Sequence, residues 1–134
     1  MKYSKIIGTG SYLPEKVVTN VDLEKILDTS DQWITERTGI RERRIAHEEE
    51  TSCDMAEVAA LEAMDAAGVS PQDIGLLIVG TTTPDLVFPS TACLLQARLS
   101  LPDCGAMDVN AACSGFLYAL SVADKYIRTG DVKR

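Results

Sequence analysis

Residues 106–117 read AMDVNAACSGFL and place two elements in immediate succession. Ala106 to Val109 has the apolar character of a buried strand. From Cys113 to Ile127 the apolar residues recur at helical spacing, and Gly130 is expected to end that helix. A strand that passes directly into a helix is typical of proteins with a parallel sheet.

The preceding segments repeat this alternation. Residues 74–79 form a near-continuous apolar run, which indicates a strand buried on both faces. A Thr51–Asp54 capping box opens a helix that is expected to end at Gly68, and Ser90 is expected to cap a helix over 91–99. The order predicts parallel strands joined by right-handed crossovers, hence a layered α/β fold with helices on both faces of the sheet. We treat residues 1–134 as one domain, and the pattern predicts a further strand after Arg134.

The first 50 residues predict shorter elements. Residues 6–14 are expected to form a strand that runs into a turn and is ended by Pro14. We also expect a helix over 21–27 capped by Asn20, a helix from a Thr29–Gln32 capping box to Gly39, and a strand over 41–46. Gly8 and Gly10 lack the third glycine and the following helix of a dinucleotide-binding loop, so we interpret them as strand and bulge glycines.

The composition indicates which kinds of binding partner the chain can have. The 134 residues carry a formal net charge of −7, which argues against nucleic acid. A local basic cluster, defined by Arg37, Arg41, Arg43 and Arg44, is equally compatible with a solvated face and with a surface for an anionic ligand. We find no signal peptide and no apolar run of membrane-spanning length. The expectation is a cytosolic protein with reduced thiols and no membrane partner.

Four cysteines are present, without C-x-x-C spacing, and there is one His, so we expect no metal site. Cys113 lies where a strand meets a helix, and the helix dipole and free N–H groups there favour a thiolate and an oxyanion. Free Cys is also among the most buried residue types, and position alone slightly favours a packing role for Cys113. We interpret Cys53, Cys93 and Cys104 as packing or surface residues.

Residues 108–116, DVNAACSGF, resemble the nucleophile segment of the β-ketoacyl-acyl carrier protein synthase III family. Further segments are similar to that family in the same order: 6–14 (IIGTGSYLP), 29–34 (TSDQWI) with 37–43 (RTGIRER), and 81–84 (TTTP) through 88–90 (FPS). The resemblance runs from about Tyr3 to Arg134.

The resemblance implies a thiolase fold, of which this chain would be most of the N-terminal half. It implies that Cys113 takes an acetyl or other short acyl group from acyl-CoA, and that malonyl-acyl carrier protein then loses CO2 and condenses with it. No redox cofactor or metal is implied. The family's catalytic His and Asn and its second oxyanion donor are expected beyond Arg134, and His47 does not match that His. The chain alone is therefore expected to perform acyl transfer at most.

The resemblance also assigns binding residues. Trp33 and Arg37 would stack on the two faces of the CoA adenine, and Thr29 would hydrogen-bond it. Without the family, Trp33 reads as a half-buried core residue and Arg37 as a surface charge. Phe88 would reach across a homodimer to line the partner's acyl pocket, or else it anchors its own loop. The dimer would join through the strand over 106–109.

Two alternatives to this initiating condensing enzyme stay open. One is a non-catalytic CoA-binding or dimerising module in which Cys113 only packs, and thiol reactivity would separate it from the enzyme. The other is a different thiolase-fold synthase, of hydroxymethylglutaryl-CoA, polyketide or alkylquinolone type. The Trp33 and Arg37 pair favours the initiating synthase among these.

Overall fold

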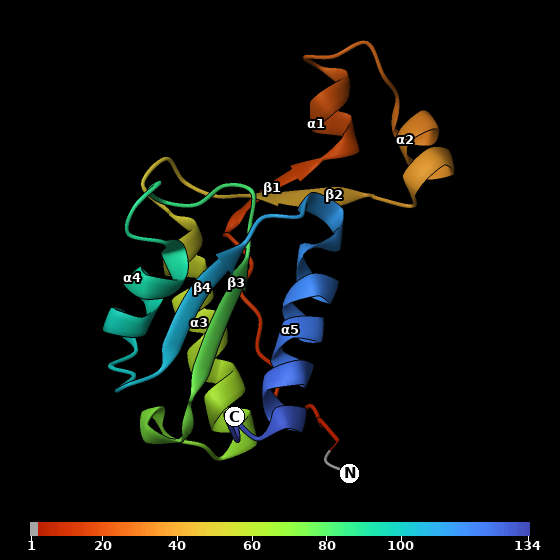
Figure 1. Cartoon of the computed structure of the whole chain (residues 1–134). Helices are drawn as coiled ribbons and strands as arrows, with labels where there is room; N and C mark the ends of the chain where they lie inside the picture. Colours follow the sequence, from red (N-terminus) through yellow and green to blue (C-terminus); the bar gives the residue numbers. More distant parts are fainter. Residues whose placement is uncertain (1–2) are drawn as a thin grey trace. The chain divides into compact units, whose positions relative to one another are not determined.

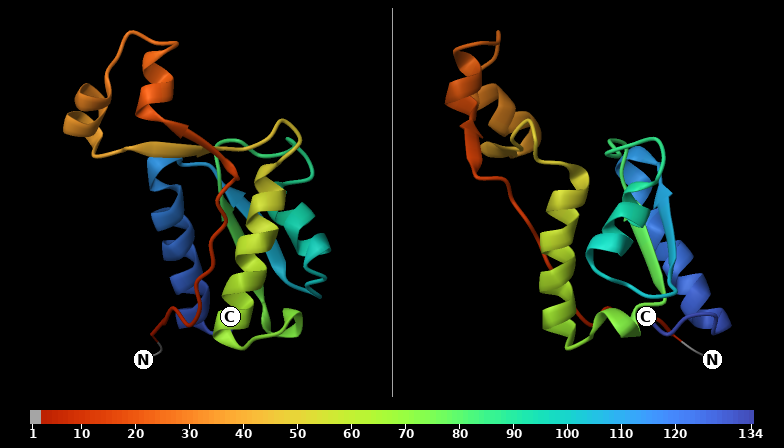
Figure 2. Two further views of the ribbon diagram at one scale, coloured as in Figure 1. Left: turned by 180° about the vertical axis from the view of Figure 1, so that it is seen from behind. Right: turned by 90° about the vertical axis from the view of Figure 1, so that its left-hand side faces the viewer.

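The computed structural model describes residues 3–134, which form two compact units. The first holds residues 3–12 and 51–134, and the second holds residues 13–50. Figure 1 labels their helices and strands, and Figure 2 gives two further views. Each unit is described below by itself, and the assignment of the whole chain to one domain stays a prediction.

A parallel pair of strands forms the centre of the first unit. Strand β3 (Leu76–Gly80) pairs with β4 (Gly105–Val109), with Leu76 opposite Gly105 and Gly80 opposite Val109. Helix α4 (Thr91–Arg98) connects them through a crossover, and α5 (Gly115–Thr129) follows β4. Helices α4 and α5 lie on opposite faces of the pair (Figure 1). The predicted strand–helix–strand–helix order is therefore confirmed.

Helix α3 (Ser52–Ala67) packs against α4 and completes this layer of helices. A short 3-10 turn, η1 (Pro71–Asp73), follows α3. The capping box of Thr51 and Asp54 and the left-handed Gly68 bound α3 as expected. The buried core joins α3 and α4 with the sheet, and its members are Cys53, Leu95, Leu99, Leu101 and Cys104. Strand β3 is only half-buried, so the prediction of burial on both faces was too strong.

The predicted strand over residues 6–14 is wrong. No strand is assigned there, because the segment lies along α3 and pairs with no strand of the described chain. A Cβ atom on Gly10 would lie 2.0 Å from the Ala59 carbonyl oxygen, and one on Gly8 would lie 2.3 Å from that of Ala63. The glycines thus serve close contact with an alanine-rich helix rather than a strand bulge.

The second unit is an antiparallel hairpin with two short helices. Strand β1 (Lys16–Thr19), which the sequence did not predict, pairs with β2 (Glu42–Ile45). Helices α1 (Asn20–Glu24) and α2 (Asp31–Thr38) lie between them in the chain. The expectation of wholly parallel pairing therefore holds for the first unit only, because the two short helices bring the chain back to β1 in the antiparallel direction.

The helix caps of this unit differ from prediction by one residue each. Thr19 caps α1 and forms a capping box with Asp22, whereas Asn20 is the first helical residue and is buried. Ser30, not Thr29, caps α2 by accepting a hydrogen bond from the Trp33 N–H. In both places neighbouring residues could cap, and sequence alone does not choose between them. The predicted stop of α2 at Gly39 is confirmed, with φ +73°.

Candidate active site

The turn that carries Cys113 connects the end of β4 to α5. Ala112 has a left-handed backbone, φ +43°, and residues Ala112–Ser114 form one turn of 3-10 helix. The regular helix begins at Gly115, two residues later than the predicted start at Cys113. Gly115 is buried against Gly80 of β3, where a Cβ atom on Gly80 would lie 3.1 Å from the Gly115 carbonyl carbon. This close contact lets α5 start directly beside the strand ends.

The start of α5 lacks a side-chain cap. Thr19, Ser30, Thr51 and Ser90 cap the other α-helices in residues 3–134, but Ser114 makes no such bond. The Ser114 N–H donates to the Ala111 carbonyl at 2.9 Å, and the structure gives the Cys113 N–H no acceptor among these residues. Cys113 is exposed. A positive helix end with a free donor beside an accessible thiol favours the oxyanion formed when that thiol attacks a carbonyl group.

Asp108 anchors the strand that leads to Cys113. Its carboxylate accepts hydrogen bonds from the first two N–H groups of α4, Thr91 at 2.9 Å and Ala92 at 2.8 Å. Both donors belong to fully buried residues. This role of Asp108 was not predicted from the sequence, although an Asp inside an apolar strand is a usable signal, because a carboxylate removed from water needs hydrogen-bond partners.

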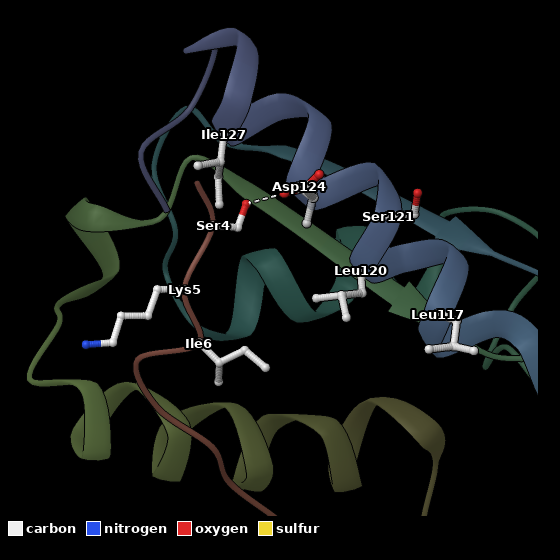
Figure 3. A pocket seen from close by; sticks show the side chains of 9 residues that line it. Ser4, Lys5, Ile6, Leu117, Leu120, Ser121, Asp124 and Ile127 are labelled. Atoms are coloured by element: carbon white, nitrogen blue, oxygen red, sulfur yellow. Dashed lines mark hydrogen bonds between the residues drawn. The ribbon is translucent and has the colours of Figure 1, made fainter. Parts of the chain in front are cut away.

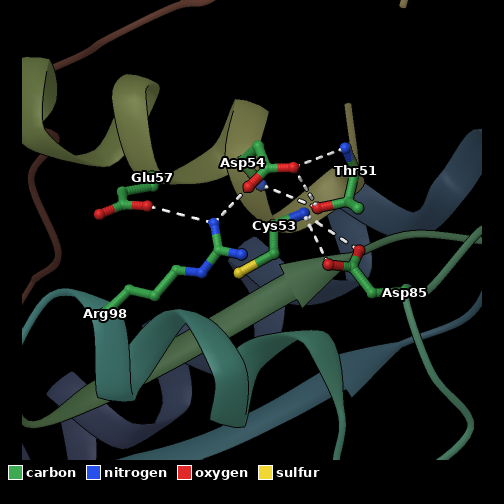
Figure 4. Close-up of polar contacts among 6 residues, drawn as sticks. All are labelled: Thr51, Cys53, Asp54, Glu57, Asp85 and Arg98. Atoms are coloured by element: carbon green, nitrogen blue, oxygen red, sulfur yellow. Dashed lines mark hydrogen bonds and ion pairs between the residues drawn. The ribbon is translucent and has the colours of Figure 1, made fainter. Parts of the chain in front are cut away.

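Hydrogen bonds connect the loop between β3 and α4 to the first turns of α4 and α3. The Thr91 hydroxyl accepts a hydrogen bond from the Asp85 N–H at 3.2 Å. The Asp85 carboxylate in turn accepts one from the Cys53 N–H at 3.1 Å, as Figure 4 shows. Asp85 therefore caps α3 from a loop that also carries Phe88. Phe88 itself is 88% exposed, which fits a residue that contacts another chain, but its role at an acyl pocket stays a prediction.

The second unit brings together two of the three predicted CoA-binding residues. A hollow of about 370 Å³ is lined by Asp28, Thr29, Ser30 and Trp33, at the entrance to α2. Trp33 is 57% exposed, so it is not the half-buried core residue that the alternative reading assumed. Arg37 follows one helical turn later and does not line this hollow. The sequence did not single out Asp28 or Ser30, since neither has a pattern that distinguishes it from a turn residue.

Comparison with known proteins agrees with the motif order. The family model of 3-oxoacyl-[acyl-carrier-protein (ACP)] synthase III matches residues 107–134, which include Cys113. A β-ketoacyl-[acyl-carrier-protein] synthase III of Xanthomonas euvesicatoria is 68% identical over 131 residues, covering 98% of this chain and 40% of the relative. The solved 3-oxoacyl-[acyl-carrier-protein] synthase III of Aquifex aeolicus is 60% identical with a TM-score of 0.90, covering 94% of this chain and 41% of the other. The chain is therefore similar along nearly its whole length to part of these synthase III proteins.

The chain has a thiolase-like fold, shared with its solved neighbours. A priming β-ketosynthase from the R1128 polyketide biosynthetic pathway also matches, with a TM-score of 0.91 at 37% identity, covering 96% of this chain and 39% of the other. The chain spans about 40% of the length of the curated relatives that it matches.

Two members of the basic cluster donate hydrogen bonds inside the second unit. Arg43 donates to the Val18 carbonyl at 3.2 Å and to the Asn20 side-chain oxygen at 2.8 Å. Arg44 donates to the Pro14 carbonyl at 3.2 Å. These two guanidinium groups hold the hairpin, which leaves Arg37 and Arg41 as the members for which a solvated and a ligand-binding reading both stay open.

His47 lies apart from the hollow at Trp33. It lines a separate hollow of about 740 Å³ together with Lys16, Ile45, Ala46, Glu48 and Glu49. Within residues 3–134, no three potential ligand side chains gather as a metal ion would require, and no helix has the length and apolar character needed to cross a membrane. The expectations of no metal and no cofactor stay predictions.

A hollow of about 450 Å³ separates the amino-terminal segment from α5 in the first unit (Figure 3). Ile6, Leu117, Leu120 and Ile127 give it an apolar lining. The Ser4 hydroxyl donates to the Asp124 carboxylate at 2.7 Å and connects its two walls. None of the predicted site residues lines it, so we assign it no part in the chemistry.

The four thiols of the chain differ in accessibility. Cys53 and Cys104 are buried, Cys93 is half-buried and Cys113 is exposed. Burial raises the pKa of both the Cys53 and the Cys104 thiol, which keeps them protonated and unreactive at neutral pH.

We therefore expect iodoacetamide to modify Cys113 first at neutral pH. Cys93 should follow, and Cys53 and Cys104 should react only when the chain unfolds, because their thiols are both inaccessible and protonated. Peptide mapping by mass spectrometry at increasing times gives the order. Modification of Cys53 or Cys104 ahead of Cys113 in the folded chain would contradict the assignment of the reactive thiol.

An ion cluster on α3 and α4 covers the buried Cys53. The Arg98 guanidinium pairs with the Asp54 carboxylate and lies 3.2 Å from the Glu57 carboxylate (Figure 4). The hydrogen bond from Arg98, followed by those from Thr51, lowers the pKa of Asp54 to about 2. All these groups are partly exposed to solvent, so the cluster is a modest contributor to stability at neutral pH.

Acid should remove this contribution. The pKa of Asp54 lies below its ordinary value of 3.8 in the folded chain, so the stabilisation is present above about pH 4 and is lost as the pH falls towards 2. We expect Arg98→Gln to be less stable than the parent chain at pH 6, and the difference to shrink between pH 4 and pH 2. Urea unfolding at each pH measures it. A difference that stays constant down to pH 2 would exclude the Arg98–Asp54 pair as its source.

Proposed function

We propose that this chain is the acyl-accepting part of an initiating condensing enzyme of fatty-acid synthesis. The observation that carries the proposal is the exposed Cys113 at the uncapped start of α5. The identity of 60–68% to β-ketoacyl-acyl carrier protein synthases III supports it. Acyl transfer and condensation are proposed for the longer protein, and acyl transfer alone for these 134 residues.

The acyl transfer would proceed through the Cys113 thiolate. The thiolate sulfur attacks the carbonyl carbon of acetyl-CoA, a carbon–sulfur bond forms, and the oxygen takes the negative charge. The free Cys113 N–H is one donor to that oxygen. The oxyanion then collapses, the bond to the CoA sulfur breaks, and CoA leaves as a thiolate, so that the acetyl group is held as a thioester on Cys113.

The condensation would follow on the acylated thiol. Malonyl-acyl carrier protein loses CO2, and the resulting carbanion attacks the acetyl thioester and releases the Cys113 thiolate. Decarboxylation needs donors that stabilise negative charge on the malonyl thioester oxygen. The single His of this chain, His47, lines a hollow with acidic neighbours, and we give it no role in that step.

The CoA nucleotide would bind at the second unit. Thr29 and Trp33 line one hollow, with a hydroxyl and a flat exposed indole that suit an adenine base. Arg37 lies one turn later on α2, where i and i+4 side chains share a face of the helix. A base inserted beside Trp33 could therefore reach the Arg37 guanidinium, which stacks well on aromatic rings.

A homodimer through β4 belongs to the same proposal. In the first unit β4 pairs with β3 on one side only, and its residues are half-buried at most. Pairing with β4 of a second copy would cover that edge. Phe88 would then line the acyl pocket of the partner. Sedimentation of the chain at several concentrations tests dimer formation directly.

Two other functions compete with this one. A priming ketosynthase of polyketide synthesis is supported by the R1128 neighbour, but at 37% identity against 60% for the Aquifex synthase III. A non-catalytic CoA-binding or dimerising module would keep Cys113 unreactive. It is disfavoured by the exposure of Cys113, since a packing thiol is expected to be buried.

Incubation with acetyl-CoA tests the proposed function. We expect one acetyl group per chain in the intact mass, with one free CoA released for each. Added malonyl-acyl carrier protein should give no 3-oxoacyl product with these 134 residues. A chain that stays unmodified at millimolar acetyl-CoA would refute acyl transfer and favour the non-catalytic module.

A further inference from the structure

The second unit has almost no apolar core. Of residues 13–50, only Pro14 and Asn20 are buried, and Asn20 is 1% exposed. Its large apolar side chains are mainly on the surface: Leu13, Val17, Val21, Ile26, Leu27, Trp33, Ile40 and Ile45 are at least 40% exposed. Apolar burial therefore cannot fix the position of α2 within this unit, and polar contacts must do so.

The Asn20 side chain makes those contacts. Its amide nitrogen donates to the Asp31 carboxylate at 2.8 Å and to the Ile40 carbonyl at 2.8 Å. The Thr35 hydroxyl lies 3.4 Å from the same nitrogen. These partners are the first residue of α2, its middle and the chain just after its end. One buried amide thus holds the helix along its length.

The other atoms of Asn20 connect α2 to the hairpin. Its side-chain oxygen accepts a hydrogen bond from the Arg43 guanidinium of β2 at 2.8 Å, and its backbone N–H donates to the Arg41 carbonyl at 3.2 Å. Donors and acceptor are all used, as expected for a buried amide. Aspartate would keep the oxygen but place a carboxylate against Asp31 and the Ile40 carbonyl, so the site requires an amide.

We propose that Asn20 is a positioning residue for nucleotide binding, because it fixes the helix whose first turn carries Trp33. The segment 28–30 that completes the hollow leads directly into Asp31, one of its hydrogen-bond partners. Asn20 does not line the hollow and acts only through α2. This inference rests on the proposed CoA function for its ligand, but the positioning of α2 can be measured without any ligand.

The test compares four variants of the full chain. Asn20→Ala removes all the side-chain hydrogen bonds. Asn20→Asp replaces the amide nitrogen, a donor, by a carboxylate oxygen, an acceptor. Asn20→Asp combined with Asp31→Asn restores a donor–acceptor pair between positions 20 and 31. Thr19→Ala is the matched control, since it removes the cap of α1 next door but leaves the contacts to α2.

Two readouts separate the inference from the proposed function. Hydrogen exchange of the α2 amides, residues 31–38, reports the position of the helix without ligand. The affinity for CoA, measured by calorimetry and by quenching of the single tryptophan, Trp33, reports binding. We expect Asn20→Ala and Asn20→Asp to increase exchange in α2 and to weaken CoA binding about tenfold. The double variant should recover part of both, and Thr19→Ala should change CoA affinity less than about twofold.

Unchanged α2 exchange and CoA affinity in Asn20→Ala would overturn the inference. So would an equal loss of affinity in Thr19→Ala, because the effect would then be general instability of the unit. If the parent chain fails to bind CoA while Asn20→Ala still loosens α2, the helix-positioning part of the inference is supported and the proposed CoA function fails.

Discussion

Replacement of Cys113 by alanine is expected to abolish acetylation of the chain by acetyl-CoA. The reason is chemical: no other thiol combines exposure with the free end of a helix among residues 3–134, and alanine offers no nucleophile. The intact mass of Cys113→Ala should stay unchanged under conditions that acetylate the parent chain fully.

The matched control is Cys93→Ala. Cys93 is the next most accessible thiol, and its N–H already donates to the Ser90 cap of α4, so it has no free helix end beside it. This variant should acetylate at the rate of the parent chain. Acetylation of Cys113→Ala at the parent rate would show that the acceptor lies elsewhere.

Replacement of Asp108 by alanine is expected to lower the free energy of unfolding by about 3 kcal/mol or more. It would leave the Thr91 and Ala92 N–H groups buried without an acceptor, since both residues are fully buried. Because Asp108 lies in the strand that precedes the Cys113 turn, acetylation should also slow. Urea unfolding followed by far-ultraviolet circular dichroism measures the stability.

Two further variants make the Asp108 prediction specific. Asp108→Asn keeps one oxygen acceptor and should cost less than the alanine variant. Asp65→Ala removes an exposed carboxylate of α3 and should change stability by less than about 0.5 kcal/mol. Equal stability of Asp108→Ala and Asp65→Ala would mean that the two hydrogen bonds to α4 contribute nothing.

The sequence predicted the first unit better than the second. The alternation of apolar runs with helical segments predicted β3, α4, β4 and α5 correctly, because packing and local propensity favour the same structure there. The prediction for segment 6–14 failed, since its isoleucine and tyrosine residues suit a strand but a strand also needs a partner with a free edge. In the described residues those glycines instead contact the backbone of α3.

The second unit was harder because polar contacts organise it. Adjacent residues such as Thr19 and Asn20, or Thr29 and Ser30, have equal capacity to cap, and only the folded structure distinguishes them. The buried role of Asn20 depends on partners 11 to 23 residues away, which no local pattern reveals. The sequence likewise could not show that Arg43 and Arg44 of the basic cluster hold the hairpin, because their backbone acceptors lie far away in the chain.

The candidate site also combines features that local sequence patterns predict with features that depend on tertiary contacts. The position of Cys113 at a strand-to-helix turn could be predicted, because strand and helix periods meet there. Its exposure, the missing cap on α5 and the anchoring of β4 through Asp108 could not, since they depend on tertiary contacts. The roles of Thr29, Trp33, Arg37 and Phe88 came from the resemblance and stay predictions.

Locating the acetyl group in the parent chain tests the central claim most directly. The chain would be incubated with acetyl-CoA, digested and sequenced by tandem mass spectrometry. We predict a single thioester-linked acetyl group on the peptide that contains Cys113, labile to hydroxylamine as thioesters are. An acetyl group on Cys93 or on lysine side chains, with Cys113 unmodified, would contradict the assignment of Cys113 as the acyl acceptor.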